Sequence, residues 1–71
     1  MINRLKLPDR WGEFLSDQPE SGMGYWIVTV ILRDGKKFER VIIVGDTITQ
    51  VGDLAEIPFA AEDITQIIVN P

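Results

Sequence analysis

Few residues of this 71-residue chain are suited to covalent or acid–base chemistry, because it contains neither cysteine nor histidine. Ser16 and Ser21 would need a neighbouring base to act as nucleophiles, and histidine, the usual base, is absent. The same absence removes the thiolate and imidazole ligands that zinc prefers. The sequence therefore predicts a chain that is not an enzyme and that uses no cofactor and no metal.

Acidic side chains are the remaining candidates for chemistry. Glu62 and Asp63 are adjacent, and Asp46, Asp53 and Glu56 are near them in sequence. Acid–base catalysis needs two carboxylates with different pKa values in a cleft, which so small a domain rarely encloses. Calcium loops need acids at alternate positions around a glycine, and no stretch of the chain has that pattern. We interpret Glu62 and Asp63 as the start of a helical turn, where the helix dipole favours negative charge.

Basic residues gather in one segment, where Arg33, Lys36, Lys37 and Arg40 surround Phe38. Cations interleaved with an aromatic ring are typical of surfaces that bind nucleic acid. Two acidic residues interrupt the segment, and the whole chain has a net charge of −4, which disfavours such binding. Lysines on an exposed hairpin also keep strand edges from pairing with other chains. Nucleic-acid binding through these four cations is therefore kept as the alternative function.

The elements that must position these residues are mostly strands. Residues 25–32 are β-branched or aromatic almost throughout, and Asp34-Gly35 after them favours a two-residue type I′ hairpin turn. Gly45-Asp46 predicts a second tight turn of type II′, since glycine comes first. The predicted elements are a helix from an Asp9 N-cap to about Ser16, strands 25–32, 37–44 and 47–51, a helical turn at 60–63 and a last strand, 64–69.

These two turns also predict a register between the strands. If Asp34-Gly35 is the whole loop, Ile31 lies opposite Phe38 and Tyr25 lies opposite Val44. Side chains alternate across a strand, so each strand contributes to two faces. One face then carries Tyr25, Ile27, Ile31, Phe38 and Ile42 with Thr47, Thr49 and Val51, and the other carries Trp26, Val28, Val30, Leu32 and Ile43 with Ile48 and Gln50.

Both faces are thus largely apolar, whereas a half-exposed antiparallel sheet alternates apolar and polar residues. Something must cover the second face. The candidates are the helix carrying Trp11, Phe14 and Leu15, the approach to the last strand at Ile57 and Phe59, or another copy of the chain. We therefore predict a mainly β fold, a small, strongly bent antiparallel sheet or SH3-like barrel or roll with a short N-terminal helix.

The chain is predicted to be a single domain, residues 1–71, with an N-terminal arm (1–24) and an antiparallel β core (25–69). All seven basic residues lie in the first forty positions, whereas residues 41–71 have five acids and no base. Such asymmetry can reflect a polar partner or self-complementary ends. No apolar stretch is long enough to span a membrane, and the N-terminus lacks the apolar region of a secretory signal, so we expect a cytoplasmic protein.

The function predicted from these features is a non-enzymatic protein-interaction or self-association module. Its partner would be a second copy of the chain in a homodimer, or another protein. Aromatic and branched residues dominate the energetics of such interfaces. The candidate interface residues are Tyr25, Ile27, Ile31, Phe38, Ile42, Trp11 and Phe14.

One combination of motifs resembles a known group of sequences. Gly22-Met23-Gly24-Tyr25, Asp34-Gly35, Ile57-Pro58-Phe59 and Glu62-Asp63-Ile64 resemble a group of short uncharacterised bacterial proteins, over about residues 21–69. The resemblance implies a small, β-rich bacterial protein without an established activity. It carries over no catalytic residue.

Overall fold

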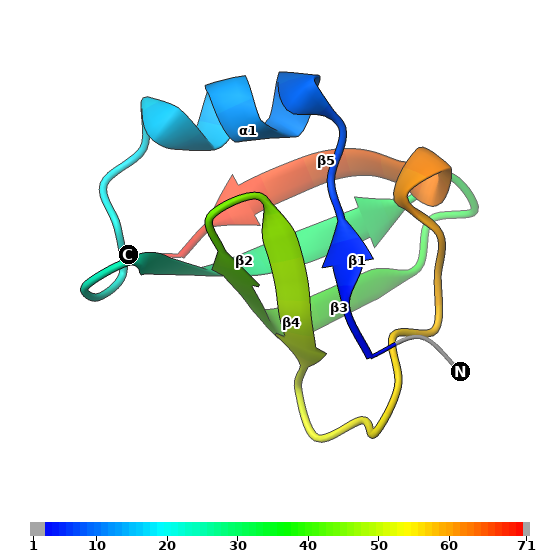
Figure 1. The fold of residues 1–71 in the computed structure, drawn as a ribbon. Coiled ribbons are helices and arrows are strands. Elements are labelled where there is room, and N and C mark those ends of the chain that lie inside the picture. Colours follow the sequence, from blue (N-terminus) through cyan, green and yellow to red (C-terminus); the bar gives the residue numbers. More distant parts are fainter. Residues whose placement is uncertain (1–2, 71) are drawn as a thin grey trace.

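The computed structural model describes residues 3–70, which form one five-stranded sheet and a short helix (Figure 1). The sheet order is β1-β4-β3-β2-β5, and every neighbouring pair is antiparallel. The mainly β, strongly bent fold is as predicted, and the strand bounds from β2 onward match the prediction. The elements are β1 (Leu5–Lys6), α1 (Asp9–Ser16), β2 (Tyr25–Leu32), β3 (Lys37–Val44), β4 (Thr47–Val51), the 3-10 helix η1 (Ala61–Asp63) and β5 (Ile64–Val69).

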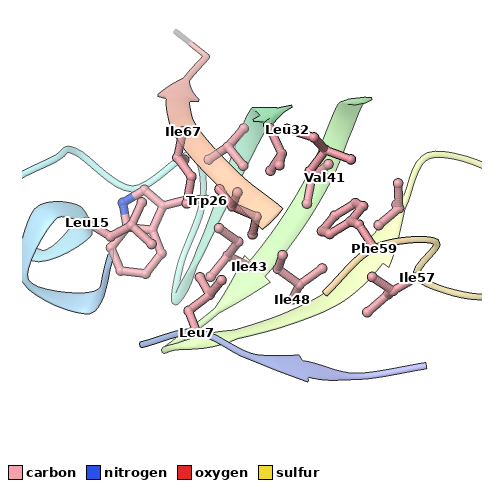
Figure 2. Close-up of a cluster of buried hydrophobic side chains, with 14 residues drawn as sticks. Leu7, Leu15, Trp26, Leu32, Val41, Ile43, Ile48, Ile57, Phe59 and Ile67 are labelled. Atoms are coloured by element: carbon pink, nitrogen blue, oxygen red, sulfur yellow. The ribbon is translucent and has the colours of Figure 1, made fainter. Parts of the chain in front are cut away.

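The sheet curls around its core as a half-barrel, and we call the side facing the core the inner face. Trp26, Val28, Val30 and Leu32 of β2 lie on this face, whereas Tyr25 lies on the opposite, outer face. Figure 2 shows their neighbours from other elements converging on the same space. The buried core consists of Leu7, Leu15, Trp26, Val28, Val30, Leu32, Val41, Ile43, Ile48, Val51, Ile57, Phe59, Ile64 and Ile67.

The N-terminal segment covers the inner face rather than the outer one. Leu15 of α1 is fully buried and lies beside Trp26 (Figure 2), whose indole N–H donates to the Gln18 carbonyl at 3.2 Å. Leu7, just before the helix, is also in the core, and β1 pairs with β4 through Leu5↔Ile48. The two-residue strand β1 was not predicted. Its pairing with β4 makes the N-terminal arm part of the sheet.

The predicted N-cap of the helix is wrong by one residue. Pro8 occupies the N-cap position, and no side chain caps it. The Pro8 carbonyl accepts from the Trp11 amide at 3.0 Å, so Asp9 already lies inside the first turn. There its carboxylate still interacts favourably with the positive end of the helix dipole.

The Asp34-Gly35 turn differs from the prediction as well. The Leu32 amide donates to the Lys36 carbonyl at 2.8 Å, so the loop contains a third residue, Arg33. Gly35 has a φ of 92°, but Asp34 does not have a positive φ, whereas a type I′ turn requires positive φ at both central residues. The second turn is as predicted, because Val44 pairs with Thr47 and Gly45 has a φ of 64°.

A β-bulge in β3 compensates for the extra loop residue. Val30 pairs with Phe38 and Val28 with Val41, so Glu39 and Arg40 together lie opposite Thr29. Arg40 has a φ of 57°, the only positive value at a non-glycine position within residues 3–70. Beyond the bulge the predicted pairs hold, from Val28↔Val41 to Tyr25↔Val44.

Two further bulges each leave a threonine unpaired. Thr49 lies between the pairs Ile42↔Gln50 and Ile43↔Ile48, and its hydroxyl donates to the Ile42 carbonyl at 3.4 Å. As a result Val51 is buried on the inner face and Gln50 lies on the outer face, the reverse of the predicted assignment.

In β5 the unpaired residue is Thr65, whose hydroxyl donates to the Ile31 carbonyl at 3.1 Å. Bulges bend the strand that carries them and increase its twist. Three bulged strands therefore account for the curl of the sheet.

Arg40 gives a test of the bulge in β3. Left-handed backbone costs a non-glycine residue about 1–2 kcal/mol. Since the exposed Arg40–Asp53 ion pair contributes little, we expect Arg40→Gly to raise the free energy of unfolding by about 1 kcal/mol. Arg40→Val should lower it by about 1–2 kcal/mol, because β-branched side chains fit this conformation worst. Urea denaturation of the variants measures both changes.

Lys37→Val is the matched control, because Lys37 is in a regular pair with Ile31. Valine suits that position, so we expect no loss of stability. Equal stability of Arg40→Val and Lys37→Val would contradict the strained bulge.

Candidate functional site: the outer face and the hairpin cleft

The outer face of the sheet carries an apolar strip across three strands. The pairs Tyr25↔Val44, Ile27↔Ile42 and Thr29↔Ile68 place its side chains next to one another. Val44 is 49% exposed and Ile68 is 42% exposed, and most of the other members are half-buried. Since α1 packs on the inner face, it does not cover this strip. We define the outer face by Tyr25, Ile27, Thr29, Ile31, Ile42, Val44 and Ile68.

Four of the predicted interface residues, Tyr25, Ile27, Ile31 and Ile42, lie together on the outer face. Phe38 does not, and its predicted place there is wrong. The bulge at Glu39 and Arg40 reverses the alternation, so Phe38 lies opposite Val30 on the inner side. Its ring centre is 5.3 Å from that of Phe59, at the edge of the core.

Trp11 and Phe14 lie on α1 and so do not join the outer face. Their rings meet edge to face with centres 6.1 Å apart, and the Arg10 guanidinium lies 5.0 Å above the Trp11 ring. Trp11 packs against the core, whereas Phe14 is 37% exposed. The two residues therefore form a separate, smaller surface patch.

Val44 and Ile68 are outer-face residues that the sequence reasoning missed. Both belong to strands that were predicted correctly. Val44 was placed opposite Tyr25 but was not singled out as a contact residue. The face of Ile68 depends on the pairing of β5 with β2, which no turn motif specifies because the two strands are far apart in sequence.

A tight turn positions Tyr25 at one end of the outer face. The Ser21 amide donates to the Tyr25 carbonyl at 2.9 Å, and the Ser21 hydroxyl accepts from the Ile27 amide at 2.8 Å. The Tyr25 ring lies so close to Gly22 that a Cβ at position 22 would overlap its atoms. Met23 at the tip of this turn is 99% exposed.

The four basic candidates do not share one surface. Arg40 lines a shallow hollow of about 230 Å³ on the outer face together with Ile27 and Ile42, and it pairs with Asp53 at 3.5 Å. Lys37 lies opposite Ile31 and therefore on the outer side. Arg33 and Lys36 instead line a cleft at the hairpin end of the inner side.

This hairpin cleft has a volume of about 380 Å³. It lies between the β2–β3 loop and the segment that leads into η1. Of the two adjacent acids considered for chemistry, Asp63 lines the cleft, and Glu62 contributes its backbone carbonyl, which accepts from the Arg33 guanidinium at 2.7 Å. The lining residues are Leu32, Arg33, Asp34, Lys36, Phe38, Pro58, Phe59 and Asp63.

Two glycines give a matched test of how Tyr25 is held. Gly22→Ala should lower the free energy of unfolding by about 0.5–1.5 kcal/mol, because the new methyl group overlaps the outer atoms of the Tyr25 ring and forces that side chain from its preferred rotamer. Gly12→Ala should raise it by up to about 1 kcal/mol, because alanine favours the helix and nothing lies within 4 Å of the added Cβ. Chemical denaturation measures both, and a neutral Gly22→Ala would show that Tyr25 is not held by this contact.

Comparison with protein-family models, curated proteins and solved structures gives no match for this chain. None of the helices within residues 3–70 is long and apolar enough to cross a membrane. The outer face and the hairpin cleft are the two features from which a function can be proposed.

Proposed function

We propose that the chain is a non-enzymatic self-association module whose outer faces pack against each other in a two-fold dimer. The observation that carries the proposal is the apolar strip on the outer face, with Val44 and Ile68 exposed at 49% and 42%. Contiguous exposed apolar patches on small proteins commonly mark interaction sites. The seven residues that define the outer face carry no charge, and Arg40, which adjoins Ile27 and Ile42, is paired with Asp53.

Single opposite charges at the two ends of the outer face support a second copy as the partner. Lys37 lies toward the hairpin end of β3, near Glu39 and the Arg40–Asp53 pair, whereas Asp46 lies toward the Tyr25 end, near Lys6 opposite Thr47. An eight-residue strand is about 26 Å long, which is several times the Debye length of about 8 Å in physiological salt. Lys37 and Asp46 therefore act on a partner as separate local charges, because each end of the face carries both signs.

A two-fold axis through the centre of the outer face would bring opposite charges together. In an isologous contact the same patch meets itself, so Lys37 of one copy would lie over Asp46 of the other. The apolar strips would then face each other as the sheets of a β-sandwich do, about 10 Å apart. Dimerisation would also bury surface for a chain whose small core gives it limited stability.

Charge insertion tests the apolar contact. We expect sedimentation velocity to show a dimer for the unmodified chain at high micromolar concentration. Ile68→Lys should weaken dimerisation at least tenfold, because it buries an unpaired ammonium in the interface. The control is Phe14→Lys, since Phe14 is 37% exposed but lies on α1, which packs on the inner face. A monomeric unmodified chain, or equal effects of the two variants, would overturn the proposal.

Charge reversal tests the two-fold arrangement separately. Lys37→Glu and Asp46→Lys should each weaken the dimer about twofold to fivefold, and the double variant should recover most of the loss. The dimer affinity that the double variant recovers should be smaller in high salt, because salt screens a charge pair near the surface. Additive losses in the double variant would show that these two residues do not meet across the interface.

A further inference from the structure

We propose that the hairpin cleft binds a small organic monoanion, a carboxylate attached to an apolar and preferably aromatic body. This site is on the inner side of the hairpin and does not depend on the dimer proposed for the outer face. Its volume of about 380 Å³ lies within the range of small-molecule sites, about 300–1,000 Å³.

The floor of the cleft is apolar and anchored in the core. Leu32 and Phe59 are 7% and 6% exposed, so their positions are fixed by packing on the interior. Phe38 leans on Phe59 at an interplanar angle of 43°. Such a surface suits the face or edge of a ligand ring, and it exists before the ligand arrives.

Two cations line the cleft, and neither forms an ion pair with a carboxylate within residues 3–70. Arg33 is held by its amide, which donates to the Asp63 carbonyl at 2.8 Å, and by its guanidinium, which donates to the Glu62 carbonyl at 2.7 Å. These partners are neutral carbonyls, and most of the guanidinium donors remain for a ligand. Within residues 3–70 the only ion pair joins Arg40 and Asp53, so neither Arg33 nor Lys36 has a carboxylate within 4.0 Å among these residues.

The two acidic side chains of the cleft, Asp34 and Asp63, accept hydrogen bonds from backbone amides of nearby turns. One Asp34 oxygen accepts from the Lys36 amide at 3.0 Å, and one Asp63 oxygen accepts from the Ala60 amide at 3.5 Å. Their charges offset those of Arg33 and Lys36 at longer range, so the cleft as a whole does not favour a multiply charged anion. A single carboxylate that reaches the free donors directly matches this arrangement, because hydrogen bonds between charged groups are stronger than neutral ones.

The test uses phenylacetate as the probe, followed by amide shifts in two-dimensional NMR of the full chain. We expect saturable shifts at Gly35, Lys36 and Phe59 with a Kd on the order of 1 mM, as befits so small a ligand. Three related compounds should each bind at least fivefold more weakly than phenylacetate. Phenylacetamide lacks the negative charge, phenethylammonium has a positive charge, and acetate lacks the aromatic ring. Equal binding of phenylacetamide, or shifts confined to the outer face, would overturn the proposal.

Two neighbouring lysines supply a matched pair of variants. Lys36→Gln should weaken phenylacetate binding about threefold to tenfold, because it removes a charged donor from the cleft. Lys37→Gln makes the same charge change on the outer side and should alter the Kd less than twofold. Equal losses of affinity in the two variants would show that only the net charge of the chain matters, and would contradict a binding site in the cleft.

Two further measurements test whether the ligand is the end of a protein chain and whether the cleft binds independently of dimerisation. A short peptide ending in a free phenylalanine carboxylate should bind no more tightly than phenylacetate, and binding over tenfold tighter would reassign the cleft to protein chain ends. Ile68→Lys should leave phenylacetate binding unchanged, since Ile68 lies on the outer face. Loss of the dimer and loss of the ligand can therefore be observed independently.

Discussion

The whole structure depends on β2, a strand that is apolar on both of its faces. Trp26, Val28, Val30 and Leu32 point inward, while Tyr25, Ile27 and Ile31 point outward. A chain with one short helix can cover only one of these faces with its own elements. α1 closes the inner side through Leu15 beside Trp26, and Ile57 and Phe59 close the other end of the same core. The outer face is the one that these elements do not cover, and its apolar character follows directly from the composition of β2.

The bulges determine which side chains each face receives. A flat sheet could not wrap around so small a core, and every bulge both bends its strand and reverses the alternation beyond it. The bulge at Arg40 moves Phe38 to the inner side, and the bulge at Thr49 moves Val51 into the core. The two threonine bulges are stabilised locally, since each hydroxyl donates to the carbonyl of the neighbouring strand. Curvature and the composition of the two surfaces thus have one cause.

Sequence reasoning predicted features that depend on local preference and missed those that depend on distant pairing. The bounds of β2, β3, β4 and β5 followed from β-branched runs and glycine turns. The bulges were not predictable, because an arginine at positive φ and unpaired threonines carry no local signal. β1 is too short for a periodic pattern and exists only because Leu5 meets Ile48. The same limit applied to the site, where Tyr25, Ile27, Ile31 and Ile42 were grouped correctly while Phe38 was misplaced.

Adjacent lysines in the β2–β3 hairpin show why charge counted along the sequence says little about function here. Lys36 continues the inner side and lines the cleft, whereas Lys37 lies opposite Ile31 on the outer side. Arg33 is tied to the Glu62 carbonyl, and Arg40 turns away at the bulge toward Asp53. Four cations within eight positions are therefore divided between two surfaces that face different ways. A polyanion approaching either surface meets only part of the cluster, so discrete contacts with single charges suit this geometry better than a continuous basic track.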